Sequence, residues 1–246
     1  ISSGFTSGTD AIGNAVKLIQ NGKAKVIIAG GVEQISLDLY MIFYMQKMLA
    51  GNEISMPFDK SRDGFIMSEG SYVFVMEDAE HALSRGARIY GEISGYGSLF
   101  SGNRNSDIEN RIEKAGNTMK SCIEDAGITT DDIDLINANG NSGKLSDLIE
   151  ARAIKELFGE KGEEIPVHTI KSTLGESYGA SGAAQTASAL LSISNDLVPP
   201  TINCDKKDPE CNLNIVSEKL EKEVNTVLIN SFDLSGNNSC LVVKKV

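Results

Sequence analysis

The stretch Asp132-Ile133-Asp134-Leu135-Ile136-Asn137-Ala138 opens a strand, helix and strand pattern. Its apolar residues form a short run typical of a buried strand. Apolar residues then recur at helical spacing over residues 145–158, and a second short apolar run follows at 167–170. Strands that alternate with helices in this way are typical of parallel sheets covered by helices. The sequence therefore predicts an α/β fold.

Other segments agree with that fold class. Residues 10–19 have apolar positions at helical spacing and stop at Asn21-Gly22, a signal for the end of a helix. Short β-branched runs at 25–30, 71–76 and 224–230 predict buried strands. An alanine-rich segment at 182–194 predicts a closely packed helix, and the polar stretch 102–107 comes nearest to a linker.

Three separated motifs carry a resemblance to a known family. They are SSGFTSGT at residues 2–9, INANGN at 136–141 and IKSTLGE at 170–176. These motifs resemble S-T-A-C-A-S-G-T, I-N-A-H-G-T and T-K-S-x-x-G-H of the β-ketoacyl-ACP synthases. Further matches in the same order are PFDKSRDGF at 57–65 with SEG at 68–70, RGARIY at 85–90, VPPTIN at 198–203 and NSF at 230–232.

The resemblance implies that three catalytic residues are replaced. Phe5 stands at the position of the nucleophilic cysteine, Asn139 at that of the first histidine and Glu176 at that of the second. The family forms a thioester on the cysteine and uses both imidazoles for decarboxylation and oxyanion stabilisation. A phenyl ring cannot attack a thioester, and an ionised carboxylate opposes a developing negative charge. We therefore expect no catalytic residue at this site.

The family's closing motif is also changed. G-F-G-G is replaced by Asp233-Leu234-Ser235-Gly236, so the gating phenylalanine becomes Leu234 and two glycines are lost. Because glycine gives such a loop its unusual dihedral angles, we expect a stiffer loop here.

Within the family, the chain is most similar to the chain-length factors, or ketosynthase β subunits, of type II polyketide synthases. Phe5 departs from the glutamine common at that position. The resemblance implies a non-catalytic subunit that pairs with an active ketosynthase and shapes the product tunnel. A malonyl-ACP decarboxylase used for priming and a stabilising pseudoenzyme are the alternatives.

The resemblance also implies a thiolase-like layered αβαβα fold built from two similar halves. Residues 1–88 would be the remainder of the N-terminal half and residues 89–246 the C-terminal half. Most of the first half would then be missing, which would leave unpaired strand edges and a bare apolar face. We therefore expect either a complementary N-terminal polypeptide as a partner, besides the active ketosynthase, or a parent chain that was cut just before Ile1.

The retained polar residues suggest a structural network. We expect Lys171 to pair with Glu150, because residues 147–150 match the family's D-x-x-E and a buried lysine needs a partner. Glu176 would join this network. Phe5 either fills the old thiol pocket as core or contacts a growing polyketide, and both histidines, His81 and His168, are expected to be structural.

Composition limits the partners. The chain has 246 residues, of which 41% are hydrophobic, and a formal net charge of -11. That charge argues against nucleic acid and anionic membranes. Two interpretations of it stay open: an acidic acyl carrier protein docks mainly on the partner ketosynthase, or the charge serves solubility alone. Four cysteines lie at no metal-ligand spacing, so we expect reduced thiols, no metal and no cofactor. Without an apolar run long enough to span a membrane or a signal sequence, a cytoplasmic location is expected.

Overall fold

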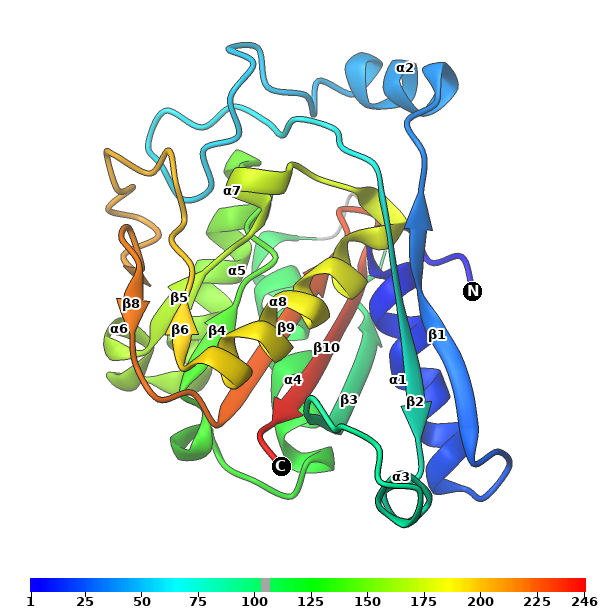
Figure 1. The fold of residues 1–246 in the computed structure, drawn as a ribbon. Coiled ribbons are helices and arrows are strands. Elements are labelled where there is room, and N and C mark those ends of the chain that lie inside the picture. Colours follow the sequence, from blue (N-terminus) through cyan, green and yellow to red (C-terminus); the bar gives the residue numbers. More distant parts are fainter. Residues whose placement is uncertain (103–106) are drawn as a thin grey trace.

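The structure is a computed structural model that describes residues 1–102 and 107–246. Its main sheet contains β3 (Glu92–Phe100), β4 (Leu135–Asn137), β5 (Pro166–His168), β7 (Asn214–Ile215), β9 (Thr226–Phe232) and β10 (Asn237–Lys244). The strands lie in the order β3-β10-β9-β4-β5-β7 (Figure 1). β9, β4, β5 and β7 run parallel to one another, whereas β10 is antiparallel to β9 and β3. The predicted parallel pairs are therefore present.

Helices cover both faces of this sheet. α4 (Ile108–Asp125) and α5 (Lys144–Phe158) lie on one face, and α1 (Ser7–Gln20) and α8 (Ser181–Asn195) lie on the other. Along β9, Leu228 packs in the cluster that contains α4 and α5, whereas Val227 and Ile229 pack in the cluster that contains α1 and α8. Side chains alternate across a strand, so an unbroken apolar strand supplies both cores at once.

A second, two-stranded antiparallel sheet packs on the far side of α1 and α8. It pairs β1 (Val26–Glu33) with β2 (Gly70–Glu77). The prediction that both would be buried strands is wrong, because their outer faces are open: Ile28 is 72% exposed and Val75 is 64% exposed. An apolar run indicates that both faces are covered, but here α1 and α8 cover one face only.

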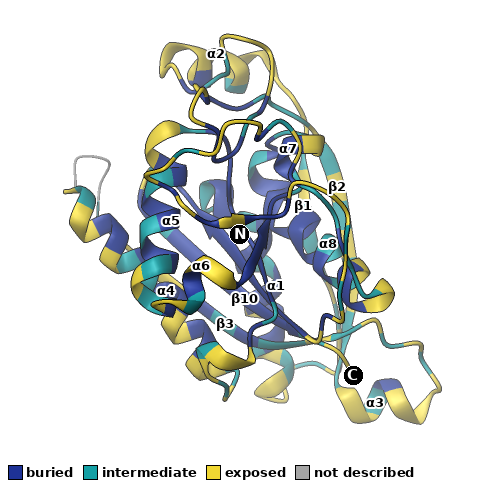
Figure 2. Cartoon of the chain, turned by 90° about the vertical axis from the view of Figure 1, so that its left-hand side faces the viewer, coloured by how far each residue is buried: buried dark blue, intermediate teal, exposed yellow. Residues whose placement is uncertain are grey.

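The remaining elements are short. They are α2 (Leu37–Met45), α3 (Ala79–Ser84), α6 (Lys161–Glu164), α7 (Lys171–Leu174), the 3-10 turns η1 (Gly4–Thr6), η2 (Thr130–Asp132) and η3 (Tyr178–Ala180), and the antiparallel pair β6 (Leu197–Val198) and β8 (Leu220–Glu221). Figure 2 shows the main sheet buried and α2 and α3 largely exposed. Most of the linker-like stretch 102–107 lies outside the described residues.

The described helices include none that is long and apolar enough to cross a lipid bilayer.

Candidate functional site

The three motifs meet at one edge of the main sheet. β4, β5 and β9 are parallel, so their carboxyl ends lie at the same edge. Asn139 follows β4, Lys171 begins α7 shortly after β5, and the turn Asp233-Leu234-Ser235-Gly236 follows β9. The topology therefore brings together segments that are far apart in the sequence.

Lys171 lies between the residues at the two histidine positions and contacts both. Its Nζ forms an ion pair with Glu176 Oε2 at 2.8 Å and donates a hydrogen bond to Asn139 Oδ1 at 2.9 Å. The side chains of Lys171 and Glu176 are 3% and 0% exposed. The backbone N–H of Phe232 also donates to Asn139 Oδ1, at 3.2 Å. The residues at the two histidine positions are therefore both bonded to one lysine.

Glu176 is held from its other side as well. Its Oε1 accepts hydrogen bonds from the Tyr178 N–H at 3.0 Å and from the Ser181 hydroxyl. Oε2 has no hydrogen-bond donor of good geometry among the described residues, so its charge is balanced by the Lys171 ion pair alone. Both oxygens of this carboxylate are therefore held by neighbouring groups.

The predicted pairing of Lys171 with Glu150 is wrong. Glu150 accepts the backbone N–H groups of Asn139 and Gly140, each at 2.8 Å, and the Asn230 side-chain amide at 2.9 Å. These donors already satisfy its two oxygens, and Lys171 turns to Glu176 instead. Complete burial raises the pKa of the Glu150 carboxyl, and these hydrogen bonds oppose that rise. Glu150 and Lys171 are both bonded to Asn139, and the charge of Lys171 also opposes the rise in the Glu150 pKa.

Phe5 lies in a cluster of aromatic rings. Its ring centre is 4.8 Å from that of Tyr178, 5.7 Å from that of Phe43 and 5.9 Å from that of Phe65, and the side chain is buried. The contacts with Tyr178 and Phe65 are edge-to-face and that with Phe43 is tilted. Edge-to-face contacts are favourable beyond the area they bury. The backbone of Tyr178 is left-handed (φ 47°), which is uncommon for a bulky residue. In this conformation the Tyr178 ring packs against Phe5.

A hollow of about 240 Å³ opens beside this cluster. Its walls are mostly apolar and come from α2, the turn at Phe5 and the β9–β10 turn. The lining residues are Phe5, Leu39, Ile42, Phe43, Gln46, Met48, Tyr178, Asp233, Leu234 and Ser235. We call it the Phe5 pocket. Phe5 is thus both a core residue and part of a pocket wall, so both readings of this side chain have a structural basis.

The β9–β10 turn is fixed to the Phe5 turn. Asp233 Oδ2 accepts the backbone N–H of Phe5 at 3.2 Å, and Oδ1 accepts that of Ser235 at 2.7 Å. Gly236 has φ +110°, so one position of the turn still requires glycine. Burial and the nearby carboxylates of Asp233 and Glu33 raise the pKa of the Tyr178 hydroxyl.

The thiols and imidazoles of the chain lie outside this constellation. Cys122, Cys204, Cys211 and Cys240 are all free and buried, and burial raises the pKa of Cys204 to about 11 and of Cys211 to about 12. His168 is buried at the end of β5, and neither ring nitrogen has a hydrogen-bond partner among the described residues. Burial lowers the pKa of His168 to about 3. A buried thiol or imidazole in such a state is a poor nucleophile or base.

His81 lies in α3, half-buried, with its Nδ1 2.8 Å from Glu77 Oε2. Neither histidine stands at a motif position, although His168 is only two residues before the motif at 170–176. The structural role expected for both stays a prediction. The described residues contain no group of His, Cys, Asp and Glu arranged to hold a metal ion.

Several residues around the site were not identified from the sequence. Asp10, nearly buried in the first turn of α1, accepts hydrogen bonds from Thr6 Oγ1 at 2.8 Å and Tyr96 Oη at 2.9 Å, and from the hydroxyls of Ser3 and Ser239. It thereby ties the Phe5 turn to β3 and β10. The hydrogen bonds from Tyr96 and Ser239 join residues far apart in the sequence. No local sequence pattern therefore predicts them.

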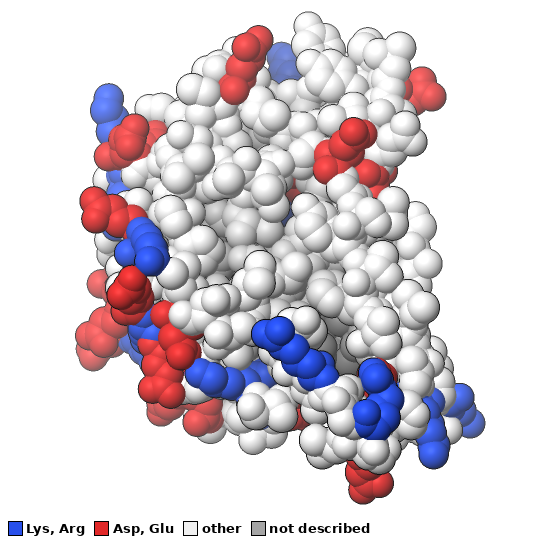
Figure 3. Space-filling model, in the orientation of Figure 1, with Lys and Arg blue, Asp and Glu red and all other residues white. Residues whose placement is uncertain are grey.

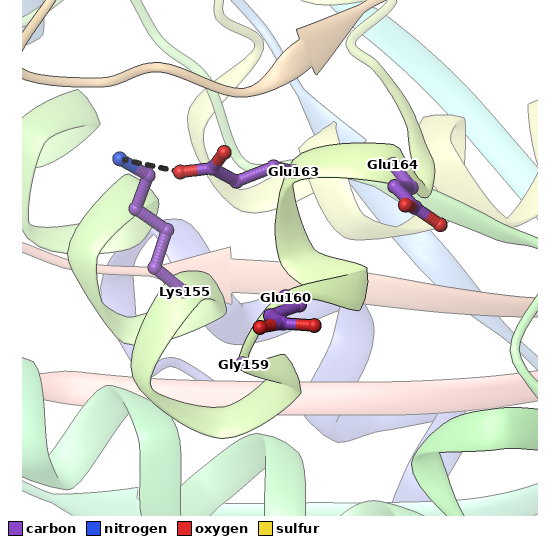
Figure 4. A pocket seen from close by; sticks show the side chains of 5 residues that line it. All are labelled: Lys155, Gly159, Glu160, Glu163 and Glu164. Carbon is purple, nitrogen blue, oxygen red and sulfur yellow. Dashed lines mark ion pairs between the residues drawn. The ribbon is translucent and has the colours of Figure 1, made fainter.

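A larger hollow of about 480 Å³ lies elsewhere, between α5 and α6. Lys155 and Glu163 point toward one another across 3.8 Å, whereas Glu160 and Glu164 lie apart from that pair (Figure 4). These glutamates are exposed, and no motif residue lines the hollow. The candidate site is therefore the Phe5 pocket with the Lys171 cluster.

Sequence models of two domains match this chain. The β-ketoacyl synthase N-terminal domain matches residues 1–82, and the β-ketoacyl synthase C-terminal domain matches residues 90–205. The chain belongs to the β-ketoacyl synthase family. Both domains are therefore represented in this chain. The division into 1–88 and 89–246 stays a prediction.

Comparisons with individual proteins also place the chain among the β-ketoacyl synthases. The chain is 37% identical to a 3-oxoacyl-[acyl-carrier-protein] synthase 2 of Coxiella burnetii, over 98% of this chain and 60% of that protein. It superposes on the ishigamide ketosynthase/chain length factor with a TM-score of 0.92 at 30% identity, covering 100% of this chain and 60% of that one. For a type II ketosynthase complexed with its acyl-carrier protein, AntDE:AntF, the TM-score is 0.95 at 30% identity, with 100% and 62% covered.

These superpositions confirm the α/β thiolase-like ketosynthase fold. The chain spans about 60% of the length of the relatives described above.

Proposed function

We propose that this β-ketoacyl synthase family member is a non-catalytic subunit of the chain-length-factor type. It would pair with an active ketosynthase in type II polyketide or fatty-acid-like biosynthesis, and its Phe5 pocket would form part of the product tunnel. The proposal is supported by its similarity to a ketosynthase/chain length factor over its whole length. Phe5, Asn139 and Glu176 are the positions where an active subunit would carry its catalytic groups.

The Lys171–Glu176 ion pair is the observation that carries this proposal. A condensing site must stabilise negative charge on an enolate and on a tetrahedral intermediate. Here the single lysine is neutralised by Glu176, and Glu150 and Asp233 add two more carboxylates nearby. Electrostatics at this edge therefore oppose the chemistry that an active ketosynthase performs.

The outer face of β1–β2 supports the proposal of a complementary N-terminal polypeptide. Ile28 and Val75 face each other in the register of the pair, and Val32 and Val73 continue the same open face. In the view of Figure 3, charged side chains gather along the lower and left edges, whereas most of the right-hand side over β1 and β2 is uncharged. A two-stranded sheet is marginal alone, so added strands would stabilise it.

Helix α2 extends the uncovered apolar surface. Its exposed residues include Leu37, Tyr44 and Met45. We propose that this face, continuous with the Phe5 pocket through Ile42 and Phe43, lies at the contact with the active ketosynthase. An obligate interface of that kind buries about 2,000 Å² or more. With a net charge of -11, the chain would leave most contacts to an acidic acyl carrier protein to its partner.

The experiment is a reconstitution of the chain with its ketosynthase partner, supplied with malonyl-loaded carrier protein. Product length and release of CO2 are measured for the wild-type complex and for Phe43→Ala, which enlarges the Phe5 pocket. Leu191→Ala, at an exposed position of α8 outside the pocket, is the control. The proposal predicts product only when the partner's own nucleophile is free, and a changed product length in Phe43→Ala alone.

Two other outcomes have distinct signatures. Release of CO2 with the partner's nucleophile blocked, and its loss in Lys171→Met, would identify a priming decarboxylase. Product of unchanged length in every pocket variant would identify a subunit that only stabilises its partner. Either outcome contradicts the proposed tunnel function.

A further inference from the structure

Asp233 is the charged residue of the Phe5 pocket. Among the described residues that line it, seven are apolar or aromatic, two are neutral and polar, and Asp233 carries the one carboxylate. Its side chain is almost completely buried at the polar end of the pocket. The charge of this end of the pocket is therefore determined by one residue.

The carboxylate is held rigidly, and it is not neutralised. Its two oxygens accept the N–H groups of Phe5 and Ser235. The backbone of Asp233 closes the turn, because its N–H donates to Asn237 O at 2.8 Å and its carbonyl accepts from Gly236 at 3.0 Å. No lysine, arginine or histidine of the described residues forms an ion pair with it.

The approach to the Phe5 N–H is also closed. Gly4 has φ +71°, and a Cβ at this position would collide with the Asp233 carboxylate. The backbone N–H of Phe5 would be one donor for an incoming anion, and Asp233 already occupies it. It would also meet an unneutralised negative charge in a mostly apolar environment, where repulsion between like charges is strong.

We infer that Asp233 determines the ligand specificity of the Phe5 pocket. The pocket accepts uncharged apolar chain segments and rejects groups that carry a carboxylate or phosphate. The inference rests on the proposed function in one respect, because the ligand class is taken to be an acyl chain. A free carboxylic acid end, or a carrier's phosphate, is kept out of the tunnel at this point, while a neutral chain end is admitted.

The test compares three probes that share a six-carbon chain: hexanol, hexanoate and hexylamine. Each is titrated at neutral pH into the purified protein, assembled with its partners, by isothermal titration calorimetry. Hexanoate is ionised at that pH. We expect hexanol to bind more tightly than hexanoate by on the order of tenfold, and hexylamine to bind at least as tightly as hexanol.

Asp233→Asn removes the charge and keeps the size and one acceptor oxygen. We expect it to raise the affinity for hexanoate by on the order of tenfold and to leave that for hexanol within about twofold. Glu164→Gln on α6, which removes an exposed carboxylate outside the pocket, is the control and should change neither. If Asp233→Asn fails to fold, the order of the three probes on the wild-type protein still decides the question.

The inference is overturned if hexanoate binds the wild-type protein as tightly as hexanol, if Asp233→Asn leaves their ratio unchanged, or if hexanol does not bind. These outcomes are independent of the proposed function. Product length could still depend on Phe43 if the charge preference failed, and the charge preference could hold in a subunit that does not affect product length.

Discussion

Breaking the Lys171–Glu176 ion pair tests whether the former catalytic cluster now stabilises the fold. The charged atoms are 2.8 Å apart, and both side chains are buried. At an effective dielectric constant of about 20, two unit charges at that distance attract by roughly 6 kcal/mol before the cost of desolvation. Removing one member leaves the other charge buried, which costs about 3–5 kcal/mol. Lys171 would retain one neutral acceptor, Asn139 Oδ1.

The assay is a double-mutant cycle with Lys171→Met, Glu176→Gln and the double variant. We expect each single change to lower the free energy of unfolding by about 3–5 kcal/mol. The double variant should lose much less than the two single losses combined, because it leaves no unpaired charge. Unfolding in urea, followed by far-ultraviolet circular dichroism on the purified protein, gives the three values.

The chain supplies a matched control. Lys219 and Glu221 form an ion pair at 2.9 Å, nearly the same distance, but their side chains are 57% and 78% exposed. Water screens such a pair, so Lys219→Met and Glu221→Gln should show no resolvable coupling. Additive losses at Lys171 and Glu176, with a coupling below about 0.5 kcal/mol, would refute the assignment of this pair as a buried structural contact.

Two further predictions concern stability. Phe5→Ala should cost about 3–5 kcal/mol of unfolding free energy, because the buried ring contacts three other aromatic rings, and a nearly unchanged melting temperature would show that Phe5 serves only as a pocket wall. For His168, the folded pKa of about 3 lies below the unfolded value of about 6.5, so the unfolded chain takes up a proton first as the pH falls. Between pH 7 and pH 5 this group alone should remove about 2 kcal/mol of stability, measured as the difference between the wild-type protein and His168→Phe. The difference is needed because burial raises the pKa of Asp147 to about 7, which acts with the opposite sign. The loss should disappear in His168→Phe and persist in His81→Gln; persistence in both variants would contradict the burial argument.

The sequence predicted the central elements because their signals are local. Helix α5 was expected over residues 145–158 and spans Lys144–Phe158, and the run at 224–230 overlaps β9. α5 has apolar residues at a helical spacing and buries the face they form, whereas β9 has an unbroken apolar run and is buried on both faces. β1 and β2 have the same kind of run but only one covered face. The exposure of a strand depends on the elements that pack against it, and the strand's own sequence does not specify those elements.

The candidate site was predictable as a set of positions and not as a set of contacts. The motifs place Phe5, Asn139 and Glu176 in the sequence, yet the partner of Lys171 depends on how Glu150 is satisfied by the turn at Asn139. The bond from Phe5 to Asp233 spans 228 residues. Such contacts follow from the topology, which brings the β9–β10 turn beside the start of α1, and short sequence patterns carry no signal for them.

The most direct test of the central claim restores the nucleophile alone. Phe5→Cys is assembled with the ketosynthase partner, whose own cysteine is blocked, and condensation of acyl- and malonyl-loaded carrier is measured. Our account predicts no condensation, because a thiol beside Asn139 and the Lys171–Glu176 ion pair lacks both imidazoles, and groups that act together lose activity non-additively. Condensation product formed by the Phe5→Cys complex above the level of the blocked wild-type complex would contradict it.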